Sequence, residues 1–317
     1  MVHPSRRRVL GYGLAGAVVV AVAGGAGVEL VSRGVLPGQG VLDSIDGACS
    51  VAAPDLASYA PPGPQVSGTF YSRARKQTVG YTIGYPPGHR PGARLPLVVM
   101  LHGYGGDHAS ALSGMSPAQA LALRVNSRPL PPMALVTADG GGGYWNPHPG
   151  DNPLAMLTDE LIPMCRRLGL GAAARDGAAP RIGVMGISMG GYGSLLLAEK
   201  RPDLIRAVAA ISPAIWTSYV QARAANAGAY ASAADFAADD VVTHAAGLAR
   251  VPVRVASGLS DPFHPGVQAF ARALPTDPGG QPAAVTFANG CHDGSFFTAQ
   301  EPPSLAFLAR HLAAPST

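Results

Sequence analysis

The sequence predicts a doubly wound α/β domain, that is, a mostly parallel β-sheet with helices on both faces. Apolar residues make up 47% and charged residues only 13% of the 317 residues, which is enough for a large core. Short aliphatic runs without polar alternation recur along the chain, as expected of strands buried on both faces. Stretches with helical spacing separate these runs, and the alternation of strand and helix favours a parallel sheet.

The strands are predicted in chain order. Residues 67–72 and 78–85 alternate more strongly between apolar and polar side chains, which indicates two antiparallel strands at the start of the sheet. The buried strands are predicted within LPLVVMLHG, MALVTADG, RIGVMGIS, AVAAISPA, VPVRVASG and AAVTFANG. The helices between them are predicted within TDELIPMCRRL, SLLLAEKRP and VQAFARAL.

The chain divides into three predicted regions. Residues 1–31 form a signal or anchor segment, and residues 32–66, rich in Pro, Gly and Ser, form a linker or N-terminal wrap. Residues 67–317 form the α/β domain. Within it, residues 216–250 are too long for a simple crossover and are alanine-rich, so we expect a small helical cap there.

The net charge of +4 is concentrated in the leader. Four arginines against one glutamate give residues 1–40 a charge of +3, so the remaining chain carries about +1. This distribution argues against a basic surface for nucleic acid. The three cysteines, Cys49, Cys165 and Cys291, allow one disulfide in an exported protein, and the sequence does not say which pair forms it.

The first residues have the layout of an export signal. Three arginines precede about twenty mostly apolar residues, and the run from Ser5 to Leu10 resembles a twin-arginine signal. The expected location is therefore the cell envelope or the medium. A transmembrane anchor is the alternative, since the apolar stretch is just long enough to span a bilayer, and it would associate the protein with the membrane.

A serine boxed by glycines follows one of the predicted strands. Gly186-Ile187-Ser188-Met189-Gly190 fits the G-x-S-x-G pattern, in which a sharp strand-to-helix turn displays the serine hydroxyl. Glycines at the flanking positions leave room for the neighbouring strand and helix. The strand before it and the helix after it are the context that this pattern requires. The alternative is an incidental turn serine in a glycine-rich chain.

A serine nucleophile needs a base, and the base needs an acid. Asp261 follows the next-to-last predicted strand and His292 follows the last one, so both lie at the rim where Ser188 is displayed. The alternatives are an Asp-Pro turn for Asp261 and a surface loop for His292. His264 and Asp293 are alternative candidates for the base and the acid, but neither offers the same position at a strand end.

An oxyanion hole needs two backbone N–H donors. Met189 is expected to supply one, at the start of the helix after Ser188. Tyr104 is expected to supply the other, because it lies in a glycine-rich loop after the LPLVVM run, where Gly103 lets the backbone approach a ligand. His102, in the same loop, is expected to form structural hydrogen bonds.

A second glycine-rich loop, Asp139 to Pro147, also follows a predicted strand. Its aromatic residues indicate a wall of the acyl or alcohol pocket, with Trp145 binding substrate. The alternative is that Trp145 packs on the core.

The chain from about Ser67 to Leu312 resembles the serine esterases of the α/β-hydrolase fold. It is most similar to the branch that contains esterase D, secreted esterases and the mycolyltransferases of actinobacteria. The resemblance rests on LPLVVMLHGYGG, DGGGGYWNP, GISMGGYGS, SGLSDPF and GCHDGSFF, in that order. It implies the roles given above for the triad and the oxyanion donors. It also implies a substrate contact at Phe296, because mycolyltransferases usually carry a tryptophan soon after the histidine.

We therefore expect an exported carboxylic-ester hydrolase that acts on a small-molecule, lipid or sugar ester and needs no metal or organic cofactor. Mycolyltransferases usually have a glutamate acid where this chain offers Asp261, which favours hydrolysis. Acyl transfer to a sugar or glycerol hydroxyl is the alternative, and a non-catalytic envelope protein is a third. The substrate and the oligomeric state do not follow from the sequence.

Overall fold

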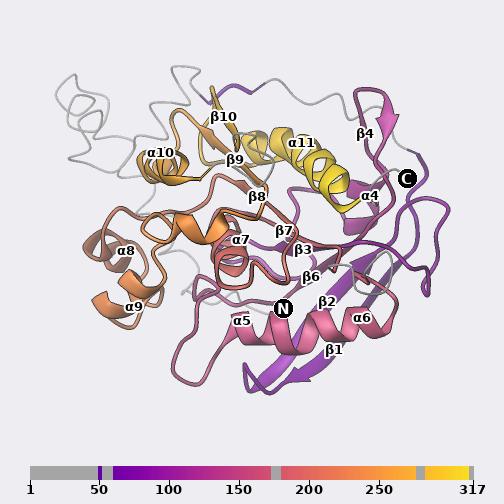
Figure 1. The fold of residues 1–317 in the computed structure, drawn as a ribbon, viewed down its shortest axis with the longest axis horizontal. Helices are drawn as coiled ribbons and strands as arrows, with labels where there is room; N and C mark the ends of the chain where they lie inside the picture. Colours follow the sequence, from indigo (N-terminus) through magenta and orange to yellow (C-terminus); the bar gives the residue numbers. More distant parts are fainter. Residues whose placement is uncertain (1–48, 52–59, 173–179, 276–282, 314–317) are drawn as a thin grey trace, which may run out of the picture. The chain divides into compact units, whose positions relative to one another are not determined.

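The computed structural model describes residues 49–51, 60–172, 180–275 and 283–313 (Figure 1). The chain separates into two units, Met1–Ser50 and Val51–Thr317, and the second contains all the strands and helices described below. The predicted export signal lies outside the described residues. Among the described residues, no helix is both long and apolar enough to cross a membrane.

The central sheet has eight strands in the order β1-β2-β6-β3-β7-β8-β9-β10. Antiparallel pairing joins β1 to β2 and β2 to β6, and all the other pairs are parallel. The predicted doubly wound fold is thus confirmed, including the antiparallel start. The strands are β1 (Gln65–Ser72), β2 (Gln77–Gly84), β3 (Leu97–Leu101), β6 (Ala134–Ala138), β7 (Ile182–Ile187), β8 (Ala207–Ile211), β9 (Val253–Gly258) and β10 (Ala284–Ala288).

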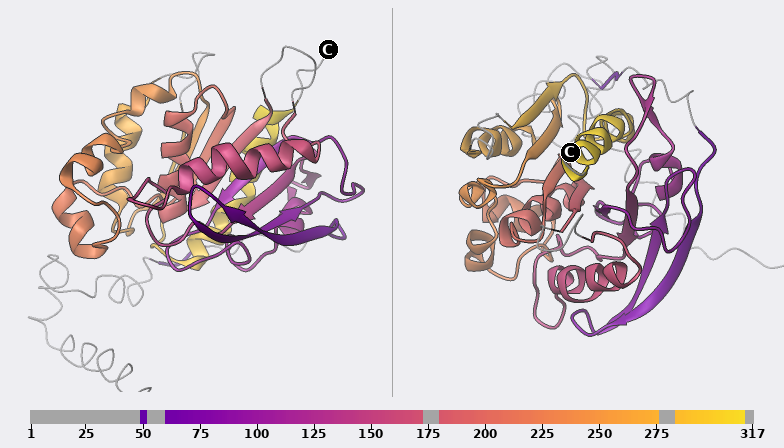
Figure 2. Two further views of the ribbon diagram at one scale, coloured as in Figure 1. Left: turned by 90° about the horizontal axis from the view of Figure 1, so that it is seen from below. Right: turned by 45° about the vertical axis from the view of Figure 1, so that its right-hand side comes forward.

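Helices cover both faces of the sheet (Figure 2). One face carries α5 (Pro153–Ala155), the π-helical turn η1 (Met156–Leu161), α6 (Ile162–Arg167), α7 (Met189–Lys200) and α10 (His264–Ala273). The other face carries α4 (Pro117–Leu121) and α11 (Gly294–Leu312).

Strand β3 shows why the sequence signal was a continuous aliphatic run. Leu97, Val99 and Leu101 pack into the core on one face of the sheet, and Val98 and Met100 pack into the core on the other. Because successive side chains of a strand point to opposite faces, a strand covered on both sides must be apolar at every position.

A small hairpin was not predicted. Strands β4 (Arg124–Val125) and β5 (Arg128–Pro129) pair antiparallel around Asn126 and Ser127, both of which have positive φ. Two successive residues with positive φ are typical of the two-residue loop that joins the strands of a β-hairpin. Each strand has only two residues, too few to show a period in the sequence.

The segment expected to form a helical cap is helical, and none of its residues lines the cavity beside Ser188. It contains α8 (Tyr219–Ala225), α9 (Ala233–Ala238) and the 3₁₀ turn η2 (Ala245–Leu248). Ser218 and Ser232 cap the two α-helices, each accepting a backbone N–H in the first turn. The segment is bonded to α7, where the Tyr192 hydroxyl donates to the Asp239 carbonyl at 2.8 Å.

Candidate active site

Ser188 occupies a strained turn between β7 and α7. Its backbone has φ 56° and ψ −119°, a conformation that non-glycine residues rarely adopt. A side chain at Gly186 would collide with the Gly190 carbonyl, and one at Gly190 would collide with the Leu101 carbonyl. The two glycines of the motif are therefore required by close backbone packing, as the sequence predicts.

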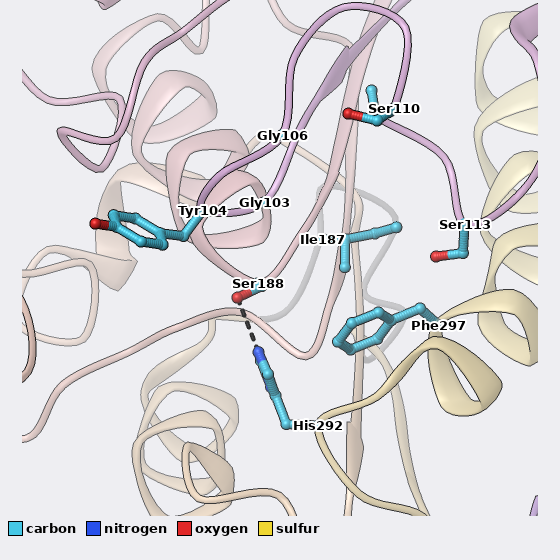
Figure 3. Close-up of a pocket in the computed structure, with 10 residues that line it drawn as sticks. Gly103, Tyr104, Gly106, Ser110, Ser113, Ile187, Ser188, His292 and Phe297 are labelled. Atoms are coloured by element: carbon cyan, nitrogen blue, oxygen red, sulfur yellow. Dashed lines mark hydrogen bonds between the residues drawn. The ribbon is translucent and has the colours of Figure 1, made fainter. Parts of the chain in front are cut away.

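Three predicted residues form one chain of hydrogen bonds. His292 Nε2 lies 2.8 Å from Ser188 Oγ (Figure 3), and His292 Nδ1 lies 2.9 Å from Asp261 Oδ2. An ionised carboxylate only accepts hydrogen bonds, so Nδ1 carries the proton of the neutral ring. The lone pair of Nε2 is then free to accept the serine proton.

The Asp261 carboxylate is buried, with its side chain 0% exposed. A buried charge needs partners for its oxygens. Phe263 N–H donates to Oδ1 at 2.8 Å, and His292 takes the other oxygen. Asp261 therefore takes part in the Asp-Pro turn and also contacts His292.

The imidazole of His292 is flanked by two phenylalanines. Phe263 lies at 5.0 Å and Phe297 at 5.1 Å between ring centroids. The alternative candidates, Asp293 and His264, have other partners. Asp293 accepts N–H groups of Ser295 and Phe296 as the N-cap of α11, and His264 contacts Ser257 Oγ and the Phe287 ring.

The loop after β3 is held by His102. The side chain is fully buried, its Nε2 accepts from Gly140 N–H at 2.8 Å, and its Nδ1 donates to the Gly103 carbonyl at 2.7 Å. Burial lowers the pKa of His102, which agrees with a neutral ring that accepts at one nitrogen and donates at the other. His102 thus has the structural role expected from the sequence.

This loop approaches Ser188 closely. A Cβ atom built on Gly103 would lie 3.6 Å from the Ser188 Cβ, and Tyr104 follows directly. Ser188 therefore stands between the Gly103–Tyr104 turn and His292, and the Tyr104 ring points away from it (Figure 3). Met189, the other expected N–H donor, is the first residue of α7.

A cavity of about 380 Å³ opens beside Ser188, and we call it the Ser188 hollow. Gly103, Ser188 and His292 line it together with Ser110, Ser113 and Phe297. Of the three predicted substrate-binding residues, only Gly103 is in this set. Ser110 and Ser113 carried no signal in the sequence, and Phe297 belongs to the Phe296-Phe297 pair that follows the histidine.

Phe296 is corrected to a core residue. It is 0% exposed and packs in the core beneath α11, whereas the half-buried Phe297 lines the hollow. Adjacent residues on a helix point about 100° apart, since there are 3.6 residues per turn. Both positions carry the same amino acid, so the pair alone could not show which ring faces the site.

Trp145 is likewise corrected, in favour of the alternative left open above. It is 0% exposed, and its Nε1 donates to the His102 carbonyl at 3.2 Å. Side chains at Gly140 or Gly193 would collide with its ring, which shows how tightly it is enclosed. Trp145 supports the loop after β3 from below and does not line the hollow.

A protein-family model described as "Putative esterase" matches residues 72–274, about two thirds of the chain. The chain belongs to this esterase family. It is therefore a carboxylic-ester hydrolase, as the sequence predicted. A search of curated proteins found no match.

Solved structures show that this esterase has the α/β-hydrolase fold. It is similar to a ferulic acid esterase, with 20% identity and a TM-score of 0.64 over 78% of this chain and 98% of the other. An S-formylglutathione hydrolase from Agrobacterium tumefaciens matches with 20% identity and a TM-score of 0.59 over 80% and 97%. The fluorophosphonate-binding serine hydrolase F of Staphylococcus aureus matches with 15% identity and a TM-score of 0.60 over 78% and 99%.

A buried glutamate of the esterase holds one wall of the Ser188 hollow. Glu301 on α11 is 0% exposed and accepts the Ser113 N–H at 2.7 Å. Its other oxygen has no hydrogen-bond partner among the described residues. Burial raises the pKa of Glu301 to about 7. Glu301 could not be identified from the sequence, because nothing in the pattern of α11 shows which face of the helix its carboxylate occupies.

We expect Glu301 to make stability depend on pH. Its folded pKa lies above the unfolded value, so the folded state binds the extra proton, and stability falls as pH rises from about 4.5 to about 7. The full shift corresponds to about 3 kcal/mol at most. In Glu301→Gln this fall should be absent, because the amide keeps the Ser113 acceptor without a charge. Urea unfolding at a series of pH values measures it, and an unchanged pH profile in the variant would contradict the assignment.

Proposed function

We propose that this esterase works through an acyl-enzyme on Ser188, with His292 as general base and Asp261 as the acid that orients it. The observation that carries the proposal is the unbroken hydrogen-bond chain from Ser188 Oγ through both imidazole nitrogens to the buried carboxylate. A weak nucleophile, an adjacent base and a third group that fixes the tautomer are the arrangement that activates a serine.

The first half of the reaction forms the acyl-enzyme. Ser188 Oγ attacks the carbonyl carbon of the ester while its proton moves to His292 Nε2. The buried Asp261 carboxylate stabilises the imidazolium that results. When the tetrahedral intermediate collapses, the bond to the alcohol oxygen breaks, and the Nε2 proton passes to that oxygen so that a neutral alcohol leaves.

The second half releases the acid. A water molecule takes the place of the alcohol and gives one proton to His292 Nε2 as its oxygen attacks the acyl carbon. Collapse of this second intermediate breaks the bond to Ser188 Oγ, which takes the proton back from Nε2. The free carboxylic acid leaves and the triad is restored, so no redox step and no further reactant is required.

The negative charge of each intermediate is assigned to the Tyr104 and Met189 backbone N–H groups. The close approach of Gly103 to Ser188 supports the first donor. The second is supported by the position of Met189 at the N-terminus of α7, where N–H groups lack helical partners and the helix dipole favours an anion. Fixed donors of this kind stabilise the transition state without reorganising.

The proposed substrate is a small-molecule carboxylic ester. The Ser188 hollow, at about 380 Å³, is within the range of ligand pockets. Solved structures with a similar fold include a ferulic acid esterase and an S-formylglutathione hydrolase, which supports ester cleavage without choosing among acyl groups. The likeness to the esterase D and mycolyltransferase branch stays a prediction.

Hydrolysis is favoured over acyl transfer by the exposure of the base. The His292 side chain is 22% exposed, so water can reach it once the alcohol has left. A transferase would instead have to keep water away from this imidazole.

We also propose export by the twin-arginine route to the envelope or medium. The Ser5–Leu10 run supports it, and so does the state of the cysteines: Cys49 and Cys291 are disulfide-bonded, while Cys165 is free and buried. Disulfides persist mainly in oxidising compartments. Burial raises the pKa of the Cys165 thiol to about 12, which makes it a poor nucleophile and fits a purely structural role.

Ser188→Ala should lower kcat/KM for a simple ester by roughly 10⁴–10⁶-fold, because the nucleophile is lost. Asp261→Asn should lower kcat by about 10⁴-fold, because the amide favours the wrong imidazole tautomer. A fluorophosphonate probe should label the wild type and not Ser188→Ala. Ser110→Ala, in the same hollow, is the control and should still be labelled. Labelling of Ser188→Ala would disprove the assignment of the nucleophile.

Product analysis separates hydrolysis from transfer. With an ester substrate in buffer, we expect the yield of free acid to stay the same when glycerol or a disaccharide is added, because water reaches the acyl-enzyme. Chromatography of the acyl products measures this. A new glycerol or sugar ester formed at the expense of free acid would favour the acyltransferase instead.

Replacing Arg6, Arg7 and Arg8 together by lysine should retain the protein inside the cell, because the charge of the leader is kept while the arginine pair is lost. Cell fractionation with antibody detection gives the result. Arg33→Lys, outside the Ser5–Leu10 run, is the matched control and should be exported normally. Normal export of the triple variant would exclude the twin-arginine route.

A further inference from the structure

A second cavity, of about 430 Å³, lies beside the triad, and we call it the Trp216 hollow. It is bounded on one side by α8, through Gln221, Ala224 and Ala225, and on the other by the chain that follows Asp261. Trp216 and Phe263 form its aromatic walls. Neither the mechanism above nor the family match assigns any role to it.

Two chain segments connect the Trp216 hollow to the catalytic residues. Ala214 N–H donates to the Ser188 carbonyl at 3.0 Å, and Trp216 follows two residues later. Phe263 donates its N–H to Asp261, and its ring lies 5.0 Å from the His292 ring. Phe263 therefore contacts both this hollow and the imidazole ring, whereas the Ser188 hollow is lined by His292 itself together with Phe297.

The walls of the hollow are set before any ligand binds. The Trp216 and Phe263 rings pack edge to face, with centroids 4.7 Å apart and planes at 76°. At the base, a side chain on Gly266 would collide with the Ile215 carbonyl, so the two segments lie in direct contact. Aromatic side chains paired in this way offer a flat apolar surface at little entropic cost.

The lining also limits what can bind. The described wall residues are aromatic, aliphatic or uncharged, and α8 contributes the uncharged Gln221 and the small side chains of Ala224 and Ala225. At the rim, the Thr217 hydroxyl is bonded to Gln221 at 2.6 Å. Ionic groups would lose hydration there without an opposite charge, whereas a flat apolar ring would gain contact on two sides.

We propose that the Trp216 hollow binds an aromatic ring carried by one arm of the ester, while the Ser188 hollow holds the other arm. The proposal rests on Ser188 as nucleophile, because an ester attacked there must extend its acyl and alcohol arms in different directions. The two hollows border different phenylalanine neighbours of His292, Phe263 and Phe297, so each hollow is available to a different arm of the ester. The substrate class is thus an ester with an aromatic acyl or alcohol group.

Ala224→Phe tests the proposal by filling the hollow from an exposed helix position without disturbing the core. Three esters are compared: methyl 3-phenylpropanoate, benzyl acetate and methyl acetate. We expect the ratio of kcat/KM for one of the aromatic esters to that for methyl acetate to fall at least about tenfold. Which aromatic ester responds tells which arm the hollow holds, and either result supports the proposal.

Val220→Phe is the matched control, because Val220 is 76% exposed on the same helix and does not line the hollow. Its ratios should equal those of the wild type. Ratios in Ala224→Phe that stay within about twofold of the wild type, or an equal fall in Val220→Phe, overturn the proposal.

A binding measurement separates failure of this inference from failure of the proposed function. The chain has two tryptophans, and Trp145 is fully buried, so a ligand in the hollow should change the fluorescence of Trp216. Titrating Ser188→Ala with the two aromatic esters should give a saturable change that Ala224→Phe abolishes in the same background. If the wild type hydrolyses none of the esters, the proposed function fails. The titration still shows whether the Trp216 hollow binds an aromatic ring. The proposal for the Trp216 hollow is rejected if the fluorescence shows no saturable change, or if the change remains in Ala224→Phe.

Discussion

The site depends on one constraint: the backbone of Ser188 must stay in a conformation that costs energy. A φ of 56° at a non-glycine residue is held only because its surroundings leave no alternative. Strand β7 is buried along its whole length and ends just before Ser188, and α7 begins just after it. Gly186 and Gly190 allow the strand and the helix to pack at contact distance. The Ser188 hydroxyl is thereby held at a fixed position next to His292. The loops after β9 and β10 place Asp261 and His292 beside it.

A second network, outside the triad, fixes the opposite side of the site. His102 joins the loop after β3 to the loop after β6, since it bonds both Gly103 and Gly140. Trp145 fills the space beneath and bonds the His102 carbonyl. The neutral state of His102, favoured by burial, suits this role because a protonated ring could not accept the Gly140 N–H. The loop that carries the proposed oxyanion donor Tyr104 is therefore supported by core packing.

The strands and the triad could be predicted from sequence because both depend on local order along the chain. Parallel strands are apolar throughout, and their carboxyl ends meet at one rim, so Ser188, Asp261 and His292 could be found from their positions after strands. The pocket walls depend on helix rotation and loop packing instead. Phe296 and Phe297 are the same residue type, and only the phase of α11 decides which one faces the hollow. Trp145 lies in a glycine-rich loop that fits either a pocket wall or a core contact. Ser113 and Glu301 meet only through a contact between residues far apart in the sequence.

The helical segment that borders the Trp216 hollow is also hydrogen-bonded to the loop after β6. Asn226, at the end of α8, donates to the Gly142 carbonyl, and Asn146 donates to the Ala229 carbonyl. Gly142 and Asn146 belong to the same loop whose Gly140 N–H is held by His102. Hydrogen bonds therefore connect α8, through this loop and His102, to Gly103 beside Ser188. In this esterase, the surface that we assign to substrate choice and the loop that we assign to charge stabilisation are therefore parts of one hydrogen-bonded structure.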